Sequence, residues 1–252
     1  MTPVDDVRLY CGDCLDVAPR VANRADAVIA DLPYGTTNCR WDTRINLADL
    51  WEMYDRVCSG PVILFAQTPF DKVLGASNLK DLRYEWIWEK SHATGHLNAK
   101  KMPMKAHENI LVFYKSLPTY NPQKTTGHTR KSAVKRADIS SVYGRQEFHT
   151  LPYDSTDRYP RSVLRYPSDK QRECLHEAQK PVALLEYLIK TYTNPGDTIL
   201  DNCMGSGSTL VACLNTGRKG VGIEIDPGVF AIAESRINRV REQSLIKEEM
   251  RG

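Results

Sequence analysis

The order of apolar and polar residues along the chain predicts short strands that alternate with helices. Apolar runs bounded by turn residues predict strands, and these runs are Asp6–Tyr10, Ala27–Ala30, Pro61–Ala66, Tyr84–Glu89, Asn109–Tyr114, Asp197–Asn202 and Lys219–Asp226. The stretches predicted as helices are Cys14–Asn23, Leu47–Cys58, Pro181–Thr193, Met204–Gly217 and Gly228–Ile246. Strands that alternate with helices are typical of a mainly parallel sheet covered by helices on both faces.

Two segments do not follow this alternation. Residues 90–108 are polar and are expected to form a long loop between two strands. Residues 116–172 are rich in proline, serine, threonine, tyrosine and basic residues, which is typical of a loop-rich insertion. Residues 116–173 also hold 11 Lys and Arg against 6 Asp and Glu, whereas the rest of the chain holds 23 against 25. This excess hints at a polyanionic partner, but on charge alone a solvated basic surface explains it better.

Length and cysteine content narrow the class of protein. A chain of 252 residues suits one large α/β domain with an inserted lobe. Seven cysteines, without a signal peptide or a long apolar span, predict reduced thiols and a cytoplasmic protein that does not enter a membrane. Cys11 and Cys14 form the one Cys-x-x-Cys pair in the sequence, so we expect no metal site.

A glycine-rich turn is predicted between a strand and a helix at Asp201–Thr209, with the sequence DNCMGSGST. Glycines let the backbone approach a ligand closely, and the following helix presents its N-terminus to that ligand. Glu224 ends the next predicted strand, where an acid can accept hydrogen bonds from ribose hydroxyls. The turn lacks the third glycine of GxGxxG, because Leu210 takes that place. A cofactor site is one interpretation, and a purely structural turn is the other.

A second polar cluster ends the predicted strand Ala27–Ala30, with the sequence DLPY at Asp31–Tyr34. A carboxylate and backbone carbonyls at a strand end are hydrogen-bond acceptors, and Tyr34 adds the face of an aromatic ring. This combination suits an amino group on a flat ring, whose hydrogens the acceptors bind while the ring stacks on the tyrosine. Taken alone, an ordinary turn explains the cluster better, since aspartate and proline are common in turns.

Together, these motifs resemble the DNA amino-methyltransferases that use S-adenosylmethionine, in the circularly permuted arrangement called the β group. DLPY resembles the catalytic D-P-P-Y of that family, with Leu32 in place of the first proline. DNCMGSGST resembles D-P-F-x-G-S-G-T-T, with Cys203 in place of phenylalanine. HEAQKP at His176–Pro181 resembles H-P-T-Q-K-P, and GDC at Gly12–Cys14 resembles the contact with the cofactor adenine. AHENILVFYK, residues 106–115, resembles a late strand of the family.

The resemblance implies a Rossmann-like, circularly permuted sheet made of two halves around an inserted target-recognition lobe. The catalytic half is residues 1–115, the lobe is residues 116–175, and the cofactor-binding half is residues 176–252. The implied activity is site-specific transfer of a methyl group from S-adenosylmethionine to adenine N6 in double-stranded DNA, with base flipping. Because the adenine amine is a poor nucleophile, Asp31 and the backbone carbonyl of Leu32 or Pro33 would accept its two hydrogens, and Tyr34 would stack on the flipped base.

The resemblance also implies binding residues for the cofactor and for DNA. The cofactor residues come from the GDC, DLPY, HEAQKP and glycine-turn motifs and from the following strand, and they are Asp13, Cys14, Asp31, His176, Lys180, Asp201, Cys203, Gly205, Ser206, Gly207, Ser208 and Glu224. Basic residues of the polar segment and the lobe are candidates for phosphate or guanine contacts, and they are Lys90, Lys100, Lys101, Lys105, Arg130, Lys131, Lys135, Arg136 and Arg145. The lobe could instead be a subunit interface of a homodimer.

Three other functions stay open at this point. An N4-cytosine methyltransferase would use the same fold and cofactor, although a serine usually opens its tetrad where this chain has Asp31. A nicotinamide-dependent dehydrogenase could use the glycine turn, but the missing third glycine and the DLPY tetrad argue against it. A DNA-binding relative without catalysis is the third, and the intact Asp31, Pro33 and Tyr34 argue against that one.

Overall fold

The computed structural model describes residues 7–22, 24–35, 44–133, 139–140, 144–145, 153–167 and 179–249. The chain folds into two compact units. The larger unit is made of residues 1–121 and 162–252, and the smaller is made of residues 122–161.

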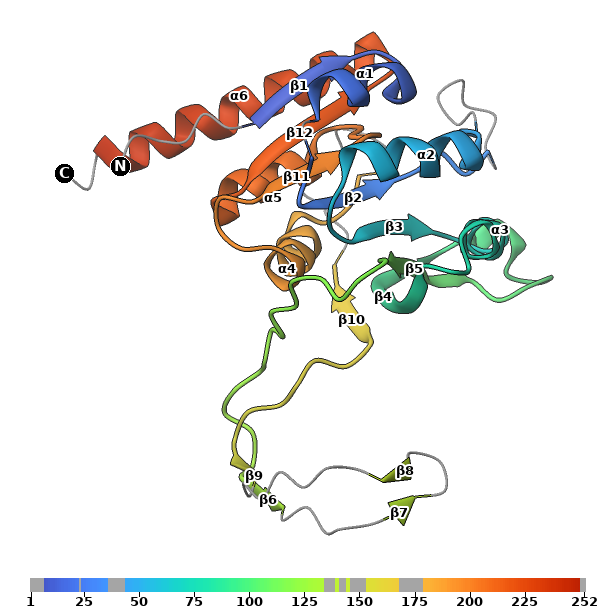
Figure 1. Ribbon diagram of the computed structural model, residues 1–252, viewed down its shortest axis with the longest axis vertical. Helices are drawn as coiled ribbons and strands as arrows, with labels where there is room; N and C mark the ends of the chain where they lie inside the picture. Colours follow the sequence, from blue (N-terminus) through green and yellow to red (C-terminus); the bar gives the residue numbers. More distant parts are fainter. Residues whose placement is uncertain are drawn as a thin grey trace. The chain divides into compact units, whose positions relative to one another are not determined.

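The larger unit is built on an eight-stranded sheet with the order β1-β12-β11-β2-β3-β5-β4-β10 (Figure 1). The strands that run in one direction are β1 (Val7–Cys11), β12 (Lys219–Glu224), β11 (Thr198–Asp201), β2 (Ala27–Asp31), β3 (Val62–Ala66), β4 (Leu82–Thr94) and β10 (Val163–Tyr166). Strand β5 (Lys105–Phe113) is antiparallel to both of its neighbours, β3 and β4. The mainly parallel α/β sheet expected from the sequence is therefore confirmed.

In the described part of the chain, three helices cover each face of this sheet. One face carries α1 (Cys14–Val21), α2 (Leu47–Val57) and α3 (Phe70–Ser77). The other face carries α4 (Val182–Tyr192), α5 (Ser208–Thr216) and α6 (Pro227–Glu249). The sheet and its helices therefore enclose two apolar cores, one on each face of the sheet.

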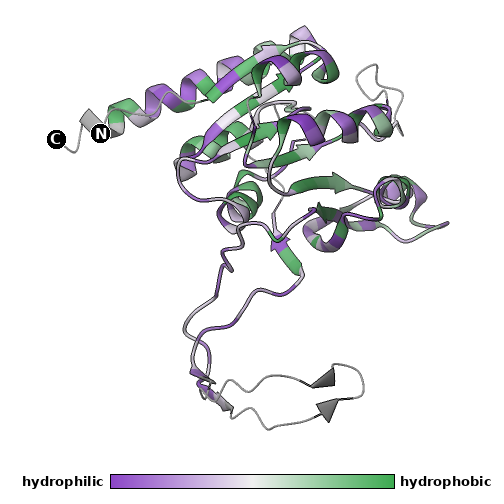
Figure 2. Cartoon of the chain, viewed as in Figure 1, coloured by the Kyte–Doolittle hydropathy of each residue, from purple (hydrophilic) through white to green (hydrophobic). Residues whose placement is uncertain are grey.

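Strand β3 shows why the central strands read as continuous apolar runs. All five of its residues are buried, and the ribbon is apolar along its length (Figure 2). Ile63 and Phe65 belong to the core beneath α4 and α5, whereas Leu64 packs in the core beneath α2 and α3. Because successive side chains of a strand point to opposite faces, a strand buried on both sides needs apolar residues at every position.

The connections of the sheet diverge between β11 and β2, which are hydrogen-bonded neighbours. From β11 the chain continues through α5 to β12 on one side, and from β2 it continues through α2 to β3 on the other. In open α/β sheets, ligands bind beyond the carboxyl ends of the strands at such a switch point. Asp201 ends β11 and Asp31 ends β2, so both acids stand at this position.

The segment expected as a long loop, residues 90–108, is mostly a β-hairpin. Strand β4 continues to Thr94 and β5 begins at Lys105, so the connection is only residues 95–104 and includes a short 3₁₀ turn, η1 (His96–Asn98). The sequence suggested a loop because its residues are polar, and they are polar because residues 91–107 are exposed throughout. A strand pair in solvent shows no apolar alternation.

Helix α3 and strand β10 have no counterpart among the expected elements. Helix α3 is only eight residues long, and β10 is a four-residue strand at the sheet edge, where only one neighbour is needed. Short elements of this kind carry too few periodic positions to stand out in a sequence. Because β10 pairs with β4, residues 163–166 belong to the large sheet. In the sequence analysis they were instead assigned to the inserted lobe, residues 116–175.

Among its described residues, the smaller unit, residues 122–161, has two short antiparallel pairs. Strand β6 (Lys131–Ala133) pairs with β9 (Tyr153–Ser155), and β7 (Ile139–Ser140) pairs with β8 (Gly144–Arg145). Its cross-links include a bidentate pair, in which Arg130 donates to both carboxylate oxygens of Asp154 at 2.6 Å. This unit lies within the segment that the sequence analysis assigned to an inserted lobe, residues 116–175.

No helix in the described ranges combines the length and the apolar character needed to cross a bilayer.

Candidate active site

The candidate site begins at the carboxyl end of β2, where Asp31 holds two neighbours through its two carboxylate oxygens. The Tyr34 hydroxyl donates to Oδ1 at 2.7 Å, and the Lys180 ammonium donates to Oδ2. Lys180 lies just before α4, 149 residues further along the chain, so the two halves of the sequence meet at this carboxylate. The structure thus brings Asp31 and Lys180, both singled out from the sequence, into direct contact.

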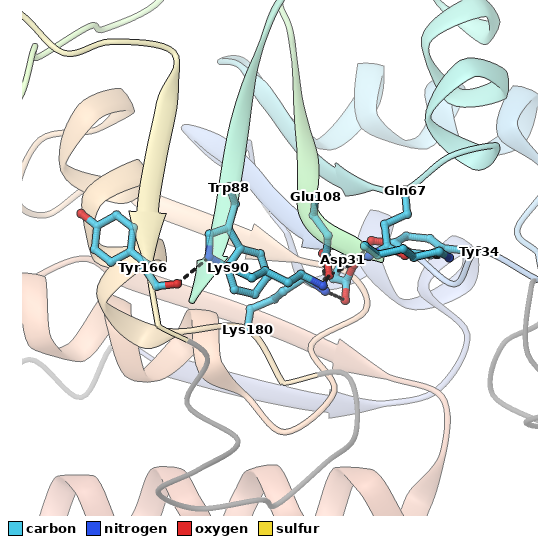
Figure 3. A network of polar contacts seen from close by, with 9 residues as sticks. Asp31, Tyr34, Gln67, Trp88, Lys90, Glu108, Tyr166 and Lys180 are labelled. Carbon is cyan, nitrogen blue, oxygen red and sulfur yellow. Dashed lines mark hydrogen bonds and ion pairs between the residues drawn. The ribbon is translucent and has the colours of Figure 1, made fainter. Parts of the chain in front are cut away.

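A second carboxylate, Glu108 on β5, completes a buried charged cluster (Figure 3). Lys180 Nζ lies 3.3 Å from Glu108 Oε2, and Lys90 Nζ of β4 lies 2.5 Å from Oε1. Gln67, at the end of β3, also donates to Glu108 Oε1 at 3.2 Å. Two lysines therefore face two carboxylates in a chain of contacts that runs from β4 through β5 and Lys180 to Asp31.

The environment shifts the pKa values of these groups in different directions. Burial raises the pKa of Asp31, and the negative charge of Glu108 adds to this, while Lys180 opposes it. Burial alone would raise the pKa of Glu108 as well, but Lys180 and Lys90 lower it below its usual range. Burial would lower the pKa of Lys180, yet the two carboxylates raise it. The contacts with Lys180 and Lys90 thus favour the charged form of Glu108, and the two carboxylates favour the charged form of Lys180.

The rest of the tetrad shapes an aromatic wall beside Asp31. Leu32 is buried, whereas Pro33 and Tyr34 are partly exposed. The Tyr34 ring stacks on Phe70 of α3 with a centroid distance of 5.2 Å and an interplanar angle of 27°. The backbone carbonyl of Tyr34 accepts a hydrogen bond from Arg44 Nε at 2.9 Å. The tyrosine ring is therefore fixed on one side by Phe70 and tethered to Asp31 by its hydroxyl.

The glycine turn lies at the carboxyl ends of β11 and β12. Glu224 accepts hydrogen bonds at 3.0 Å from the backbone N–H groups of Gly205 and Asp226, so its carboxylate holds the turn in place. Gly207 has φ +77° at the N-terminus of α5, a left-handed conformation that glycine adopts without a steric cost. Behind the turn, Arg236 of α6 donates to the hydroxyls of Ser206 and Ser208 at 3.3 and 2.9 Å.

Asp201 is a buried acid between this turn and Asp31. Its carboxylate accepts a hydrogen bond from the backbone N–H of Cys203 at 3.2 Å. Burial raises the pKa of Asp201 to about 7, and the charges of Asp31 and Glu224 contribute to the shift. A carboxyl group of this kind can be protonated or ionised near neutral pH, depending on what lies against it.

Two thiols border the turn on the side of α1. Asn202 Nδ2 lies 3.6 Å from Cys14 Sγ and 3.4 Å from Cys203 Sγ, and Tyr54 of α2 donates to the Asn202 side-chain oxygen at 2.7 Å. Contact with Cys203 lowers the pKa of Cys14, whereas the pKa of Cys203 is raised well above its usual value. Asp13 caps α1 by accepting from the backbone N–H of Leu15 at 2.9 Å.

The predicted site residues thus fall into two groups at one edge of the sheet. The structure brings Asp31, Leu32, Pro33, Tyr34 and Lys180 together. It also places together the remaining cofactor candidates that it describes, which are Asp13, Cys14, Asp201, Cys203, Gly205, Ser206, Gly207, Ser208 and Glu224. His176 lies outside the described residues.

The basic residues expected at DNA have different surroundings. Lys100, Lys101 and Lys105 are exposed at the β4–β5 hairpin, and Lys131 is exposed in β6. The side chain of Lys90, by contrast, is only 11% exposed and pairs with Glu108, so it belongs to the charged cluster rather than to the surface. Arg130 is exposed and engaged by Asp154. Lys135 and Arg136 lie outside the described residues, as does the side chain of Arg145.

Sequence reasoning missed Glu108 and Gln67 as members of the site. The signal for Glu108 was present in AHENILVFYK, where one acid stands two residues before the apolar run that begins at Ile110. A charged residue at the start of a buried strand needs a partner, because an unpaired buried charge is strongly unfavourable. Gln67 carried no comparable signal, since a polar residue after a buried strand is ordinary.

Comparison with known proteins identifies the family to which the chain belongs. The model of the DNA methylase family matches residues 50–235, which is most of the chain. The Type II methyltransferase M.HpaI of Haemophilus parainfluenzae is 26% identical over 92% of this chain and 74% of its own length. The DNA adenine methyltransferase YhdJ of Escherichia coli is 31% identical over 60% of this chain and 51% of its own length.

A solved structure agrees with this match at the level of the fold. The crystal structure of the M1.HpyAVI–SAM complex has a TM-score of 0.61 to this chain, with 22% sequence identity, and the match covers 91% of this chain and 99% of that one. The methyltransferase family uses S-adenosyl-L-methionine as its cofactor. The chain therefore belongs to the N6/N4 DNA methyltransferase family.

Proposed function

We propose that this protein transfers the methyl group of S-adenosylmethionine to N6 of adenine in double-stranded DNA. The observation that carries the proposal is the position of Asp31 and Tyr34, a carboxylate and a stacking ring at the switch point of the sheet. The glycine turn stands at the ends of the adjacent strands β11 and β12. One partial relative is named as a DNA adenine methyltransferase, which agrees with this proposal, and one structural neighbour is named as a cytosine-N4-specific methyltransferase.

The adenine amine needs help from the protein, because its lone pair is delocalised into the ring. Asp31 would accept one amino hydrogen and the backbone carbonyl of Leu32 or Pro33 the other, which localises the lone pair on nitrogen. The interaction strengthens as positive charge develops on that nitrogen, so it lowers the barrier rather than merely binding the substrate. Asp31 already accepts from Tyr34 and Lys180, but an ionised carboxylate has about four acceptor positions and can take a further donor.

Tyr34 is the proposed platform for the flipped base. One face of its ring lies against Phe70, and the base would stack on the other. The hydroxyl bond to Asp31 fixes the ring and the carboxylate relative to each other. The amine and its acceptor would then be aligned by rigid groups, which is the main contribution a protein makes to a direct displacement.

The residues around the glycine turn fit the cofactor. When bound, S-adenosylmethionine supplies an electrophilic methyl group on a sulfonium centre. The Glu224 carboxylate at the end of β12 suits the ribose hydroxyls, and the thiols of Cys14 and Cys203 offer a soft, weakly polar surface for the adenine. Asp31, Asp201 and Lys180 would face the charged methionine end, where Asp201 can ionise opposite an ammonium group.

DNA contacts are proposed for the exposed lysines of the β4–β5 hairpin and for the central lobe, drawn from the sequence as residues 116–175. Lys100, Lys101 and Lys105 would contact phosphates, which makes binding dependent on salt. The lobe is the proposed target-recognition element, because it interrupts the motif order and carries the positive excess of the chain.

N4-cytosine methylation is the alternative. Cytosine also presents a conjugated amine, and the family includes both activities. The aspartate at the first position of the tetrad favours adenine, since a serine is usual there in cytosine enzymes. A relative that binds DNA without catalysis would not need Asp31, Tyr34 and Lys180 in contact.

The test is direct. The purified protein is incubated with S-adenosylmethionine labelled in its methyl group and with genomic DNA that lacks methylation, and the DNA is digested to nucleosides. N6-methyladenine is expected. N4-methylcytosine alone would replace the adenine assignment, and no labelled nucleoside together with tight cofactor binding would indicate a non-catalytic relative. The Asp31→Ala variant, checked for an unchanged melting temperature, is the negative control.

A further inference from the structure

The β4–β5 hairpin has an unusual surface for a segment with regular structure. Every residue from 91 to 107 is exposed, although β4 and β5 pair with each other at Glu89 and His107 and, after a break in the register, at Thr94 and Lys105. Its apolar side chains do not turn inward: Leu97 is 88% exposed and Met102 is 53% exposed. A single exposed leucine is ordinary on a protein surface. Several exposed apolar side chains on one arm indicate a surface that binds a partner.

The charge of the hairpin identifies the partner's chemistry. Residues 91–107 contain three lysines and three histidines and no aspartate or glutamate. Two of the lysines, Lys100 and Lys101, lie two and three residues after the 3₁₀ turn that carries Leu97. A second copy of this arm would bring like charges together, which disfavours a contact between subunits at this tip. A polyanion that also offers an apolar surface fits better, and stacked bases between phosphates are such a surface.

The base of the hairpin is fixed beside the catalytic carboxylate. Lys90 and Glu108 flank the exposed stretch on either side, and they pair with each other at 2.5 Å inside the charged cluster. Glu108 contacts Lys180, which contacts Asp31. Leu97 is seven residues beyond Lys90, so the backbone at the tip can lie at most about 23 Å from that of Lys90 at 3.3 Å per residue. The hairpin extends away from the sheet in the region of α3 (Figure 1).

We propose that this hairpin is a DNA-binding arm and that Leu97 enters the base stack at the position vacated by the flipped base. The inference rests on the proposed function, which requires the target base to leave the duplex. Flipping leaves a gap between two neighbouring base pairs, and an apolar side chain that fills the gap holds those pairs apart and delays the return of the base. Lys100 and Lys101 bind the phosphates on either side, so that the arm combines a sequence-independent anchor with an apolar wedge.

Three variants separate these roles. Leu97→Ala removes the wedge. Lys100→Ala combined with Lys101→Ala removes the anchor. Leu79→Ala is the matched control, because Leu79 is also exposed, at 71%, but precedes β4 at the strand end opposite the hairpin tip. Two duplexes are compared, one with the target base paired and one with an abasic site opposite the target, where flipping breaks no base pair.

The wedge predicts a result that depends on the substrate. With paired DNA, Leu97→Ala should methylate at least about tenfold more slowly than wild type, while the abasic duplex should restore most of the rate. A tenfold loss corresponds to about 1.4 kcal/mol of transition-state stabilisation. The fluorescence of 2-aminopurine at the target position should rise on binding of wild type and rise less with Leu97→Ala. The double lysine variant should lose affinity for both duplexes, and the steepness of its salt dependence should decrease.

Two outcomes would overturn the proposal. One is a Leu97→Ala protein with the wild-type rate and fluorescence on both duplexes. The other is a loss of rate that accompanies dissociation of a dimer in analytical ultracentrifugation, which would make Leu97 a subunit contact. Failure of the proposed function is recognised separately, since wild type itself would then leave both duplexes unmethylated.

Discussion

Replacing Glu108 by glutamine tests the energetic role of the charged cluster. The change keeps the size of the side chain and its ability to accept hydrogen bonds, but it removes one of the two negative charges that face Lys90 and Lys180. Lys180 retains Asp31, whereas the Lys90 ammonium, 11% exposed, loses its ionic partner. Loss of one partner from a buried ion pair typically lowers the free energy of unfolding by about 3–5 kcal/mol, because the other charge stays desolvated.

The pH dependence of this difference in unfolding free energy follows from the lowered pKa of Glu108. A carboxyl group with a depressed pKa in the folded state stabilises the protein above its unfolded pKa of about 4.3, and this stabilisation is lost as the pH falls through the folded value. The difference in unfolding free energy between wild type and Glu108→Gln should therefore be full at pH 7 and should shrink below about pH 4.

Urea denaturation followed by tryptophan fluorescence measures this difference. Glu89→Gln is the matched control, since Glu89 lies on the adjoining strand β4 and pairs with Arg165 at 2.7 Å, but with both side chains well exposed. Surface pairs of this kind contribute little. Similar small losses for the two variants would refute the argument that burial makes the Glu108 cluster important, and so would a difference that does not change with pH.

Three further predictions concern the groups around Asp31. The pKa of Asp201 is raised to about 7 in the folded protein, so wild type should lose stability as the pH rises from about 4 to 7. The Asp201→Asn variant lacks this carboxyl group and should not show that loss. Urea unfolding curves of both proteins at pH 5 and pH 8 measure the difference, and the same pH dependence in the two proteins would contradict it. Tyr34→Phe should retain more methylation than Tyr34→Ala, since it keeps the ring on Phe70 and loses only the hydroxyl bond to Asp31; equal turnover of the two would argue against stacking. Glu224→Gln should weaken cofactor binding by about 1.5–3 kcal/mol, measured by calorimetry, because charged hydrogen bonds to the ribose are lost. An unchanged affinity would mean that Glu224 serves only to hold the backbone of Gly205 and Asp226.

The core of this fold could be predicted from the sequence because its signals are local. Val62–Ala66 is apolar at every position, and the structure buries it on both faces. Gly217 was expected to end a helix, and it caps α5 with φ +68°. In each case a few neighbouring residues decide the outcome, so no knowledge of the tertiary structure is needed.

The charged cluster could be predicted only in part, because its partners are distant in sequence. Asp31 and Lys180 carried recognisable motifs, but nothing in the sequence states that Glu108 faces both of them. Lys90 shows most clearly how little the sequence reveals of such contacts. It begins the polar segment 90–108 and was expected at the surface, but it instead pairs with the buried acid Glu108. The strand pairing of β4 with β5 sets that contact, and pairing is a property of the whole sheet.

The contact between Lys180 and Asp31 has a consequence for how this chain can vary. It closes a loop of 149 residues, and the smaller unit, residues 122–161, lies entirely within that loop. The entropy of closing a loop grows only with the logarithm of its length, so removing those 40 residues would change the closure free energy by about 0.3 kcal/mol. An insertion at this point is therefore nearly neutral for the assembly of the site. We therefore expect that lobes of quite different length and composition could be exchanged there without disturbing the contact between Asp31 and Lys180.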